Sequence, residues 1–150
     1  MELSDLYSEK ILDLAGNAPQ PGRLAAPDVS ARKVSRVCGS VIEVDLAVRD
    51  GIIAGYGHDI SACALGQTSA AVVAREIVGT PIAEFLAVRQ AMHAMLKGEG
   101  QPPTGKWDDL RYLEPVRDYP ARHVSTLLVF DAVAAALEKL ESTQAFAAQS

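Results

Sequence analysis

The stretch SVIEVDLAVRDGIIAGYGHDI, residues 40–60, limits the folds open to this chain more than any other segment. Before the turn, apolar side chains take every second position, the period of a strand with one buried face: Ile42, Val44, Leu46 and Val48. Asp50-Gly51 then suits a type I′ turn, because that turn needs a positive φ at both central residues. The stretch therefore predicts an antiparallel hairpin, and KVSRV, residues 33–37, is a candidate third strand.

Helical patterns lie on both sides of this hairpin. Residues 4–14 carry a rough apolar stripe and predict a first helix, which the Gly- and Pro-rich segment 16–28 ends. After the hairpin, the alanine-rich residues 65–78 predict a second helix that closes at Gly79. The pattern thus changes from a period of two to a helical period just after Cys63.

The rest of the chain is also mainly helical. Thr80-Pro81 predict the N-cap and first residue of a helix that runs to about Leu96. WDDLRYLEPV, residues 107–116, predicts one helical turn, and the last long helix is expected from near Pro120 to about Leu140. A helix, a small antiparallel sheet and then several helices indicate an α+β fold rather than alternating βαβ units.

Composition limits the class of protein. The 150 residues suit one domain with a single core, which we place at about residues 4–140, followed by a C-terminal tail expected to be disordered. A net charge of −5 argues against nucleic acid as a partner, because phosphate binding needs an excess of Lys and Arg. No apolar run is long enough to span a membrane, and the acidic start MELSDLYSEK does not resemble a signal peptide. We therefore expect a cytoplasmic protein without a membrane partner.

The two cysteines lie on either side of the hairpin. Cys38 precedes its first strand, and Cys63 follows its second strand at the start of a helix. A hairpin brings its ends together, so both sulfurs could share one site, and the helix start favours a thiolate at Cys63. The structural alternative is that both are free cysteines filling the core. Two thiols do not complete a metal site, since zinc and iron–sulfur clusters usually take four ligands.

Histidines offer further ligands. His58 and His123 are candidates, with a surface or capping role as the alternative, whereas His93 in the middle of a helix is expected to be a structural or surface residue. A nucleophilic pair of Cys63 and His123 is open as well, although no third orienting group is evident. The sequence contains no dinucleotide-binding GxGxxG, Walker loop, HExxH or GxSxG motif, so we do not expect an enzyme.

Four segments in order carry a family resemblance: LYSEKILDLAGNAPQPGRL, CGS, DGIIAGYGHDISACALGQTSAAVVAREIVG and YPARHVSTLLVFDAV. Together they resemble the NifU N-terminal domain family, the IscU and SufU scaffolds of iron–sulfur cluster assembly, over about residues 5–140. The resemblance implies a three-stranded antiparallel sheet packed against several helices, with three cysteines at one end. Those cysteines accept sulfur from a cysteine desulfurase and hold a labile [2Fe–2S] cluster or zinc.

The sequence departs from the family pattern at two ligand positions. The family's first two cysteines fall on Cys38 and Cys63, but its third falls on Ser125 and the Asp of its CGD motif on Ser40. A serine hydroxyl is a much poorer ligand for iron or zinc than a thiolate. YPARH and the long segment GEGQPPTGKWDDLRYLEPVRD are closer to the SufU type, and the Leu-Pro-Pro-Val-Lys segment of IscU-type scaffolds is absent.

The expected function is therefore that of a scaffold-like assembly protein. Cys38 and Cys63 would accept sulfur and iron or bind zinc, with Ser125 at the third cofactor position and Arg122 or His123 tuning it. His58 and His123 could complete a mixed metal site with the cysteines, or a homodimer could supply four thiolates. The alternatives are a degenerate adaptor that binds no cluster and docks or regulates a desulfurase or another assembly protein, and a shuttle that carries a persulfide on Cys63.

Overall fold

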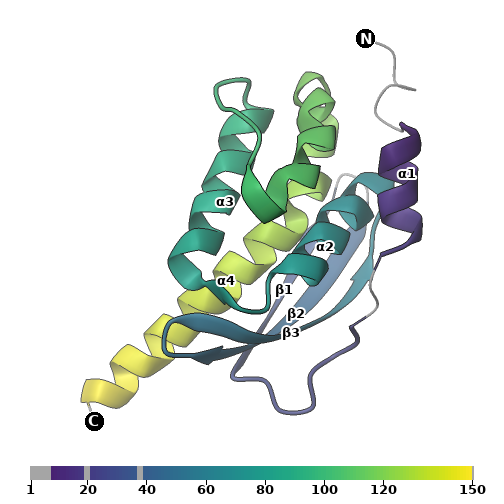
Figure 1. Ribbon diagram of the computed structural model, residues 1–150. Helices are drawn as coiled ribbons and strands as arrows, with labels where there is room; N and C mark the ends of the chain where they lie inside the picture. Colours follow the sequence, from purple (N-terminus) through teal and green to yellow (C-terminus); the bar gives the residue numbers. More distant parts are fainter. Residues whose placement is uncertain (1–7, 19–20, 37–38, 150) are drawn as a thin grey trace.

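The computed structural model describes residues 8–18, 21–36 and 39–149, with side chains as far as residue 143. A four-stranded antiparallel sheet and several helices make up an α+β fold, as the sequence predicts (Figure 1). The elements in chain order are α1 (Glu9–Gly16), β1 (Val29–Ser35), β2 (Ser40–Arg49), β3 (Ile52–Ser61), α2 (Ala64–Glu76), β4 (Thr80–Pro81), α3 (Ile82–Leu96), the 3-10 helices η2 (Gly105–Asp118) and η3 (Pro120–Arg122), and α4 (His123–Gln149).

The hairpin of β2 and β3 forms as its pattern predicts. In the register, Val44 lies opposite Ala31 of β1 on one side and opposite His58 of β3 on the other. The turn residues have positive φ, 54° at Asp50 and 76° at Gly51, as a type I′ turn requires. The third strand, β1, is longer than the predicted segment and begins at Val29.

A fourth, very short strand corrects the prediction of three strands. Thr80-Pro81 pair with Ile52-Ile53 at the free edge of β3, and Pro81 rather than Thr80 is the N-cap of α3. The hydroxyl of Thr80 donates to the carbonyl oxygen of Glu76 at 2.9 Å. Thr80 therefore satisfies the end of α2 instead of starting α3, which is why the capping prediction is wrong here.

Other element boundaries also differ from the predictions. α1 begins at Glu9, where the side chain of Ser8 accepts a hydrogen bond from the amide of Ile11, while residues 1–7 lie outside the described part. The segment predicted to hold one helical turn is a 14-residue 3-10 helix, η2. α4 runs on to Gln149, beyond the end near Leu140 that its pattern predicts. None of the helices within the described residues combines the length and apolarity needed to cross a bilayer.

Helices cover one face of the sheet and bury its alternate residues. The side chains of Ile42, Val44 and Leu46 on β2 are fully buried in a core that α2 and α4 complete. α3 and η2 pack outside α4, where the rings of Phe85 and Phe130 stack with centroids 5.9 Å apart. Figure 1 shows α4 crossing the sheet diagonally, with α1 beside α2 at one side.

Residues 21–28, which precede β1, lie against the opposite face of the sheet. Asp45 points to that face and is fully buried, because the guanidinium of Arg23 donates to its carboxylate from Nε at 2.6 Å and Nη2 at 2.8 Å. The amide of Leu24 donates to the same carboxylate at 3.0 Å. At Gly57, opposite Asp45 in the register, an added Cβ would lie 2.4 Å from the carbonyl oxygen of Gly22, so this close approach needs glycine. Residues 22–24 are therefore fixed to the sheet.

Candidate functional site

Cys63 lies at the junction between β3 and α2. It is the N-cap residue of α2, with φ −67° and ψ 172°, but its side chain makes no capping hydrogen bond. Its Sγ lies instead 3.1 Å from the Oγ of Ser125, near the start of α4. The cysteine is partly exposed, whereas Ser125 is only 1% exposed. The partly exposed thiol of Cys63 therefore contacts the buried hydroxyl of Ser125.

Ser40 brings a second hydroxyl to the same place. Its Oγ lies 3.5 Å from that of Ser125, and its side chain is 2% exposed. Ser40 is the first residue of β2 and lies opposite Ser35, the last residue of β1. The starts of β2, α2 and α4 therefore meet at one end of the sheet. This end brings together the positions that the resemblance marks as the second cysteine, the third cysteine and the aspartate.

Gly66 explains how the two helices come this close. A Cβ at this residue would lie 3.1 Å from the Oγ and 3.2 Å from the carbonyl oxygen of Ser125. Glycine therefore lets the first turn of α2 pack directly against the backbone of α4. Sequence analysis missed this residue, although a glycine inside an otherwise alanine-rich helical pattern signals a close approach.

Cys38 lies outside the described residues, so the predicted pairing of its sulfur with that of Cys63 stays a prediction. The neighbouring Gly39 has φ 71°, a left-handed conformation that glycine adopts at little cost. Ser40 then begins β2 against Ser125.

His58 lies on the helix-covered face of β3 and is 8% exposed. Its Nδ1 lies 2.6 Å from the hydroxyl of Tyr56, and the two rings meet edge to face. Burial lowers the pKa of His58 and raises that of Tyr56, so the histidine is neutral and the phenol protonated. The phenol then donates to Nδ1, which leaves the ring proton on Nε2.

His123 has a backbone partner. Its Nε2 lies 2.9 Å from the carbonyl oxygen of Val116 and 3.2 Å from that of Arg117, so the ring binds the end of η2. His93, as expected, has a structural contact: its Nε2 lies 2.8 Å from Oδ1 of Asp131 on α4. Within residues 8–18, 21–36 and 39–149, no three His, Cys, Asp or Glu side chains gather into a group able to hold a metal ion. A metal role for His58 or His123 stays a prediction.

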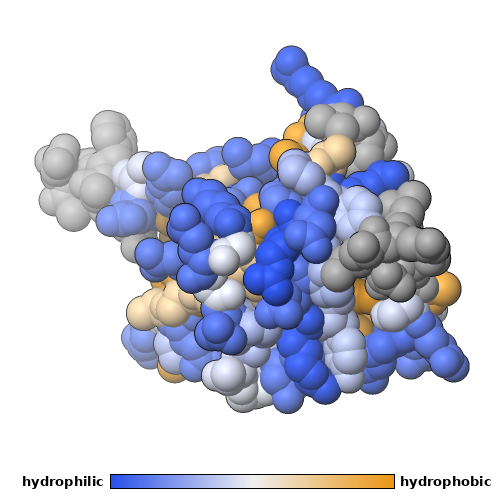
Figure 2. Space-filling model, turned by 90° about the horizontal axis from the view of Figure 1, so that it is seen from above, coloured by the Kyte–Doolittle hydropathy of each residue, from blue (hydrophilic) through white to orange (hydrophobic). Residues whose placement is uncertain are grey.

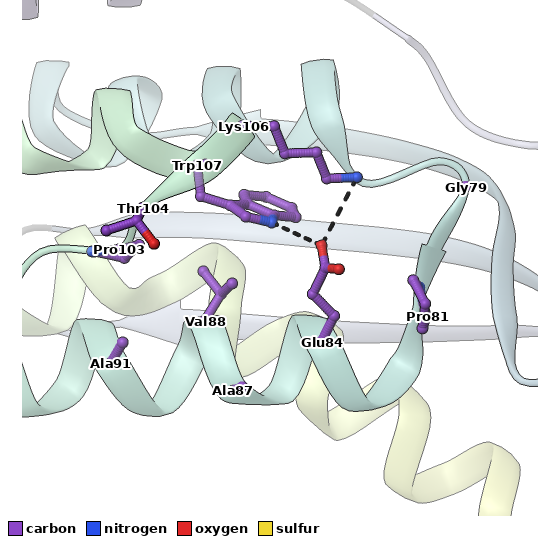
Figure 3. Close-up of a pocket in the computed structure, with 11 residues that line it drawn as sticks. Gly79, Pro81, Glu84, Ala87, Val88, Ala91, Pro103, Thr104, Lys106 and Trp107 are labelled. Carbon is purple, nitrogen blue, oxygen red and sulfur yellow. Dashed lines mark hydrogen bonds and ion pairs between the residues drawn. The ribbon is translucent and has the colours of Figure 1, made fainter.

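A separate hollow of about 620 Å³ lies between α3 and the start of η2 (Figure 3). Trp107 donates from Nε1 to Oε2 of Glu84 at 3.1 Å, and Nζ of Lys106 lies 3.9 Å from the same oxygen. Lys106 also donates to the hydroxyl of Thr80 at 2.6 Å. These polar groups satisfy one another and hold η2 against α3. The hollow has no cysteine or histidine in its lining, so Cys63 and Ser125 remain the better candidate site.

The face of the molecule seen from above is mainly hydrophilic (Figure 2). Figure 2 views the molecule from above, and hydrophobic residues form small separate areas on that face rather than one broad patch. Val124, next to Ser125 on α4, is 47% exposed. The described part of the site offers one soft sulfur ligand and two neutral hydroxyls, which suits sulfur chemistry better than a complete metal site.

The chain thus forms a small α+β domain in which the starts of β2, α2 and α4 meet around a cysteine. The sequence pattern of the NifU-like N terminal domain matches residues 6–126, and the chain belongs to this family. It is 27% identical over 135 residues to the iron–sulfur cluster assembly scaffold protein IscU of Thermotoga maritima, covering 90% of this chain and 94% of that protein.

Solved structures show the same fold. The N-terminal part of a NifU-like protein from Brucella abortus superposes with a TM-score of 0.90 at 47% identity, covering 93% of this chain and 97% of that one. A SufU-type protein of the SUF system from Fervidobacterium islandicum superposes with a TM-score of 0.82 at 20% identity, covering 91% and 99%.

Proposed function

We propose that this protein serves iron–sulfur cluster assembly as a scaffold-like carrier that accepts sulfur and iron through Cys63 and Cys38. The observation that supports the proposal most is the contact of 3.1 Å between Sγ of Cys63 and Oγ of Ser125. It joins a partly exposed thiol to the third ligand position of the family. The scaffold relative from Thermotoga maritima supports the same class of function.

Sulfur acceptance needs only the thiol and a donor persulfide. The thiolate of Cys63 attacks the terminal sulfur of a persulfide on a cysteine desulfurase. A new S–S bond forms on Cys63 while the bond between the donor's two sulfurs breaks, and the donor cysteine leaves as a thiolate. The exchange is redox-neutral, so it needs no further oxidant. The hydroxyl of Ser125 can donate to a negative sulfur at Cys63, because a hydroxyl hydrogen rotates toward an acceptor.

A cluster bound by thiolates alone needs more cysteine ligands than one chain has. The sequence has two cysteines, and a [2Fe–2S] cluster bound by thiolates alone takes four. Ser40 and Ser125 do not replace the missing thiolates, because their hydroxyls are neutral at physiological pH. A cluster would therefore be shared by two chains, each giving Cys38 and Cys63. A zinc ion held in the same way would also need both chains.

Anaerobic reconstitution with iron, cysteine and a cysteine desulfurase tests the proposal. We expect about one [2Fe–2S] cluster per two chains, read from visible absorption and iron analysis, together with a dimer in sedimentation. Cys63→Ser should abolish both the absorption and the gain of one sulfur atom in the mass spectrum, and Cys38→Ser should abolish the absorption. Ser61→Ala, at an exposed residue near Cys63, is the control and should behave like the wild type.

A non-binding adaptor is the second candidate function. The neutral hydroxyls of Ser40 and Ser125 at two ligand positions favour it, because they weaken any cluster site. The adaptor function replaces the carrier function under two conditions. The wild type gains neither iron nor sulfur, and the wild type and Cys63→Ser both bind the desulfurase and change its turnover to the same extent. If the wild type gains sulfur without iron, the persulfide shuttle replaces the carrier function.

A further inference from the structure

A second surface lies at the other end of α4, away from Cys63. A groove of about 730 Å³ runs between the turn of the β2–β3 hairpin, the first turns of α3 and the C-terminal half of α4. Figure 1 shows α4 passing the base of α3 and this hairpin before it extends beyond the body of the molecule. The apolar side chains of the groove are Val48, Ile82, Leu86, Ala134, Leu137 and Leu140.

Three carboxylates border this apolar surface. Asp50 lies in the hairpin turn, and Glu138 and Glu141 lie on the same side of α4, three residues apart. All three are exposed, and the ion pairs within the described residues include none of them. The border of the groove therefore carries negative charge that no cation of the described residues pairs.

Nearby cations are bound elsewhere. Arg49, beside the turn, pairs with Asp28 at 2.8 Å, and Arg89, which lines the groove, pairs with Asp131 at 2.9 Å. Lys139, between the two glutamates along the chain, donates to the carbonyl oxygen of Ser30 at 2.6 Å. Each cation next to the groove is therefore engaged by another element, and the carboxylates remain available to an outside partner.

We propose that this groove binds an amphipathic helix of a partner protein, with apolar side chains on one face and Lys or Arg on its flanks. The apolar floor receives the apolar face, and the three carboxylates pair with the basic flanks. A second copy of this chain fits less well, because joining two such grooves would bring their glutamates together. An added strand also fits less well, since β4 already pairs with β3 at Ile52-Ile53.

The test uses the metal-free protein and a fluorescein-labelled leucine–lysine peptide of about five helical turns, with all leucines on one face. Fluorescence anisotropy should show saturable binding. Glu138→Gln with Glu141→Gln should weaken it about tenfold, which corresponds to about 1.4 kcal/mol. The control, Glu9→Gln with Glu99→Gln, changes the net charge equally at exposed residues outside the groove and should leave affinity within about twofold.

Leu86→Asp separates groove binding from simple charge attraction. Leu86 is 39% exposed, so the change should leave the fold intact, which circular dichroism checks. Binding in the groove predicts weaker binding of the peptide, whereas charge attraction alone predicts tighter binding to the more acidic protein. Two results overturn the proposal. One is an equal loss of peptide affinity in the groove variant (Glu138→Gln with Glu141→Gln) and in the control (Glu9→Gln with Glu99→Gln). The other is tighter binding of the peptide by Leu86→Asp. A dimer of the wild type that Leu86→Asp dissociates assigns the groove to a second copy instead. Metal-free protein keeps this result independent of cluster assembly.

Discussion

Arg23 and Asp45 form a two-point ion pair on the face of the sheet that the helices leave open. The side chain of Asp45 is buried, whereas that of Arg23 is 43% exposed. The hydrogen bonds from Arg23 first, and then those from Ser30 and Leu24, hold the pKa of Asp45 at about 2 against an ordinary 3.8. The pair therefore holds the segment around Arg23, which precedes β1, against β2.

This ion pair predicts how stability depends on pH. The pKa of Asp45 is lowered in the folded state, so its contribution is complete above about pH 4 and is lost as the pH falls toward 2. Asp45→Asn should lower the free energy of unfolding by about 1–3 kcal/mol at pH 7 and flatten its fall between pH 4 and 2. Urea unfolding at each pH measures both effects. Asp59→Asn, at an exposed position on β3, should change neither by more than about 0.5 kcal/mol.

Gly66→Ala tests the close approach of α2 and α4. The added methyl group would lie 2.9 Å from Cβ of Ala62 and 3.1 Å from Oγ of Ser125, so the helix start must shift. We expect a loss of about 1–3 kcal/mol in unfolding free energy and a changed rate of alkylation at Cys63. Gly16→Ala is the matched control, since its new Cβ meets nothing within 4 Å. Similar behaviour of the two variants would contradict the packing role of Gly66.

Ser125→Cys places a thiol beside Cys63 at the family's third ligand position. Together with Cys38 this gives three thiolates in one chain, so iron bound per chain after reconstitution should rise about twofold. The visible absorption should also survive dilution better, because one chain would hold most of the ligands. Thr126→Cys, also buried and the next residue on α4, is the control and should bring no gain. Equal iron content in the wild type and Ser125→Cys would argue against a site at this position.

Ser69 and Thr68 predict opposite effects on stability. The buried Oγ of Ser69 has no hydrogen-bond partner among the described residues, so Ser69→Ala should raise the unfolding free energy by about 0.5–1.5 kcal/mol. Thr68 donates to the carbonyl oxygens of Ile11 at 3.1 Å and Ala64 at 2.8 Å. Thr68→Val should therefore destabilise by about 1–2 kcal/mol, because it removes the buried hydrogen bond that joins α2 to α1. Thermal unfolding of both variants compares the signs directly.

The sequence predicts the hairpin well because its period and its turn agree. The alternation through Val44 and Leu46 and the Asp50-Gly51 turn depend only on neighbouring residues, so the register follows from them. Thr80-Pro81 misled the prediction because the same residues suit a helix start, and only the nearby edge of β3 makes them a strand.

The site was only partly predictable for the same reason. Cys63 and Ser125 could be proposed from the family pattern, because it places both at element starts. The roles of His58 and His123 depend on Tyr56 and on the end of η2, contacts that no local pattern encodes. Gly66 likewise has meaning only once α4 lies against it.

The length of α4 has a consequence for binding at its two ends. Ser125 lies near its start and Glu138 beside the acidic groove, about 20 Å apart at the rise of a helix. A partner seated in the groove would leave Cys63 uncovered, and a second module tethered to that partner would meet the thiol at a raised effective concentration. The length of α4 would then set the distance between the docking groove and Cys63. Binding in the groove would make a weak sulfur exchange at Cys63 more frequent.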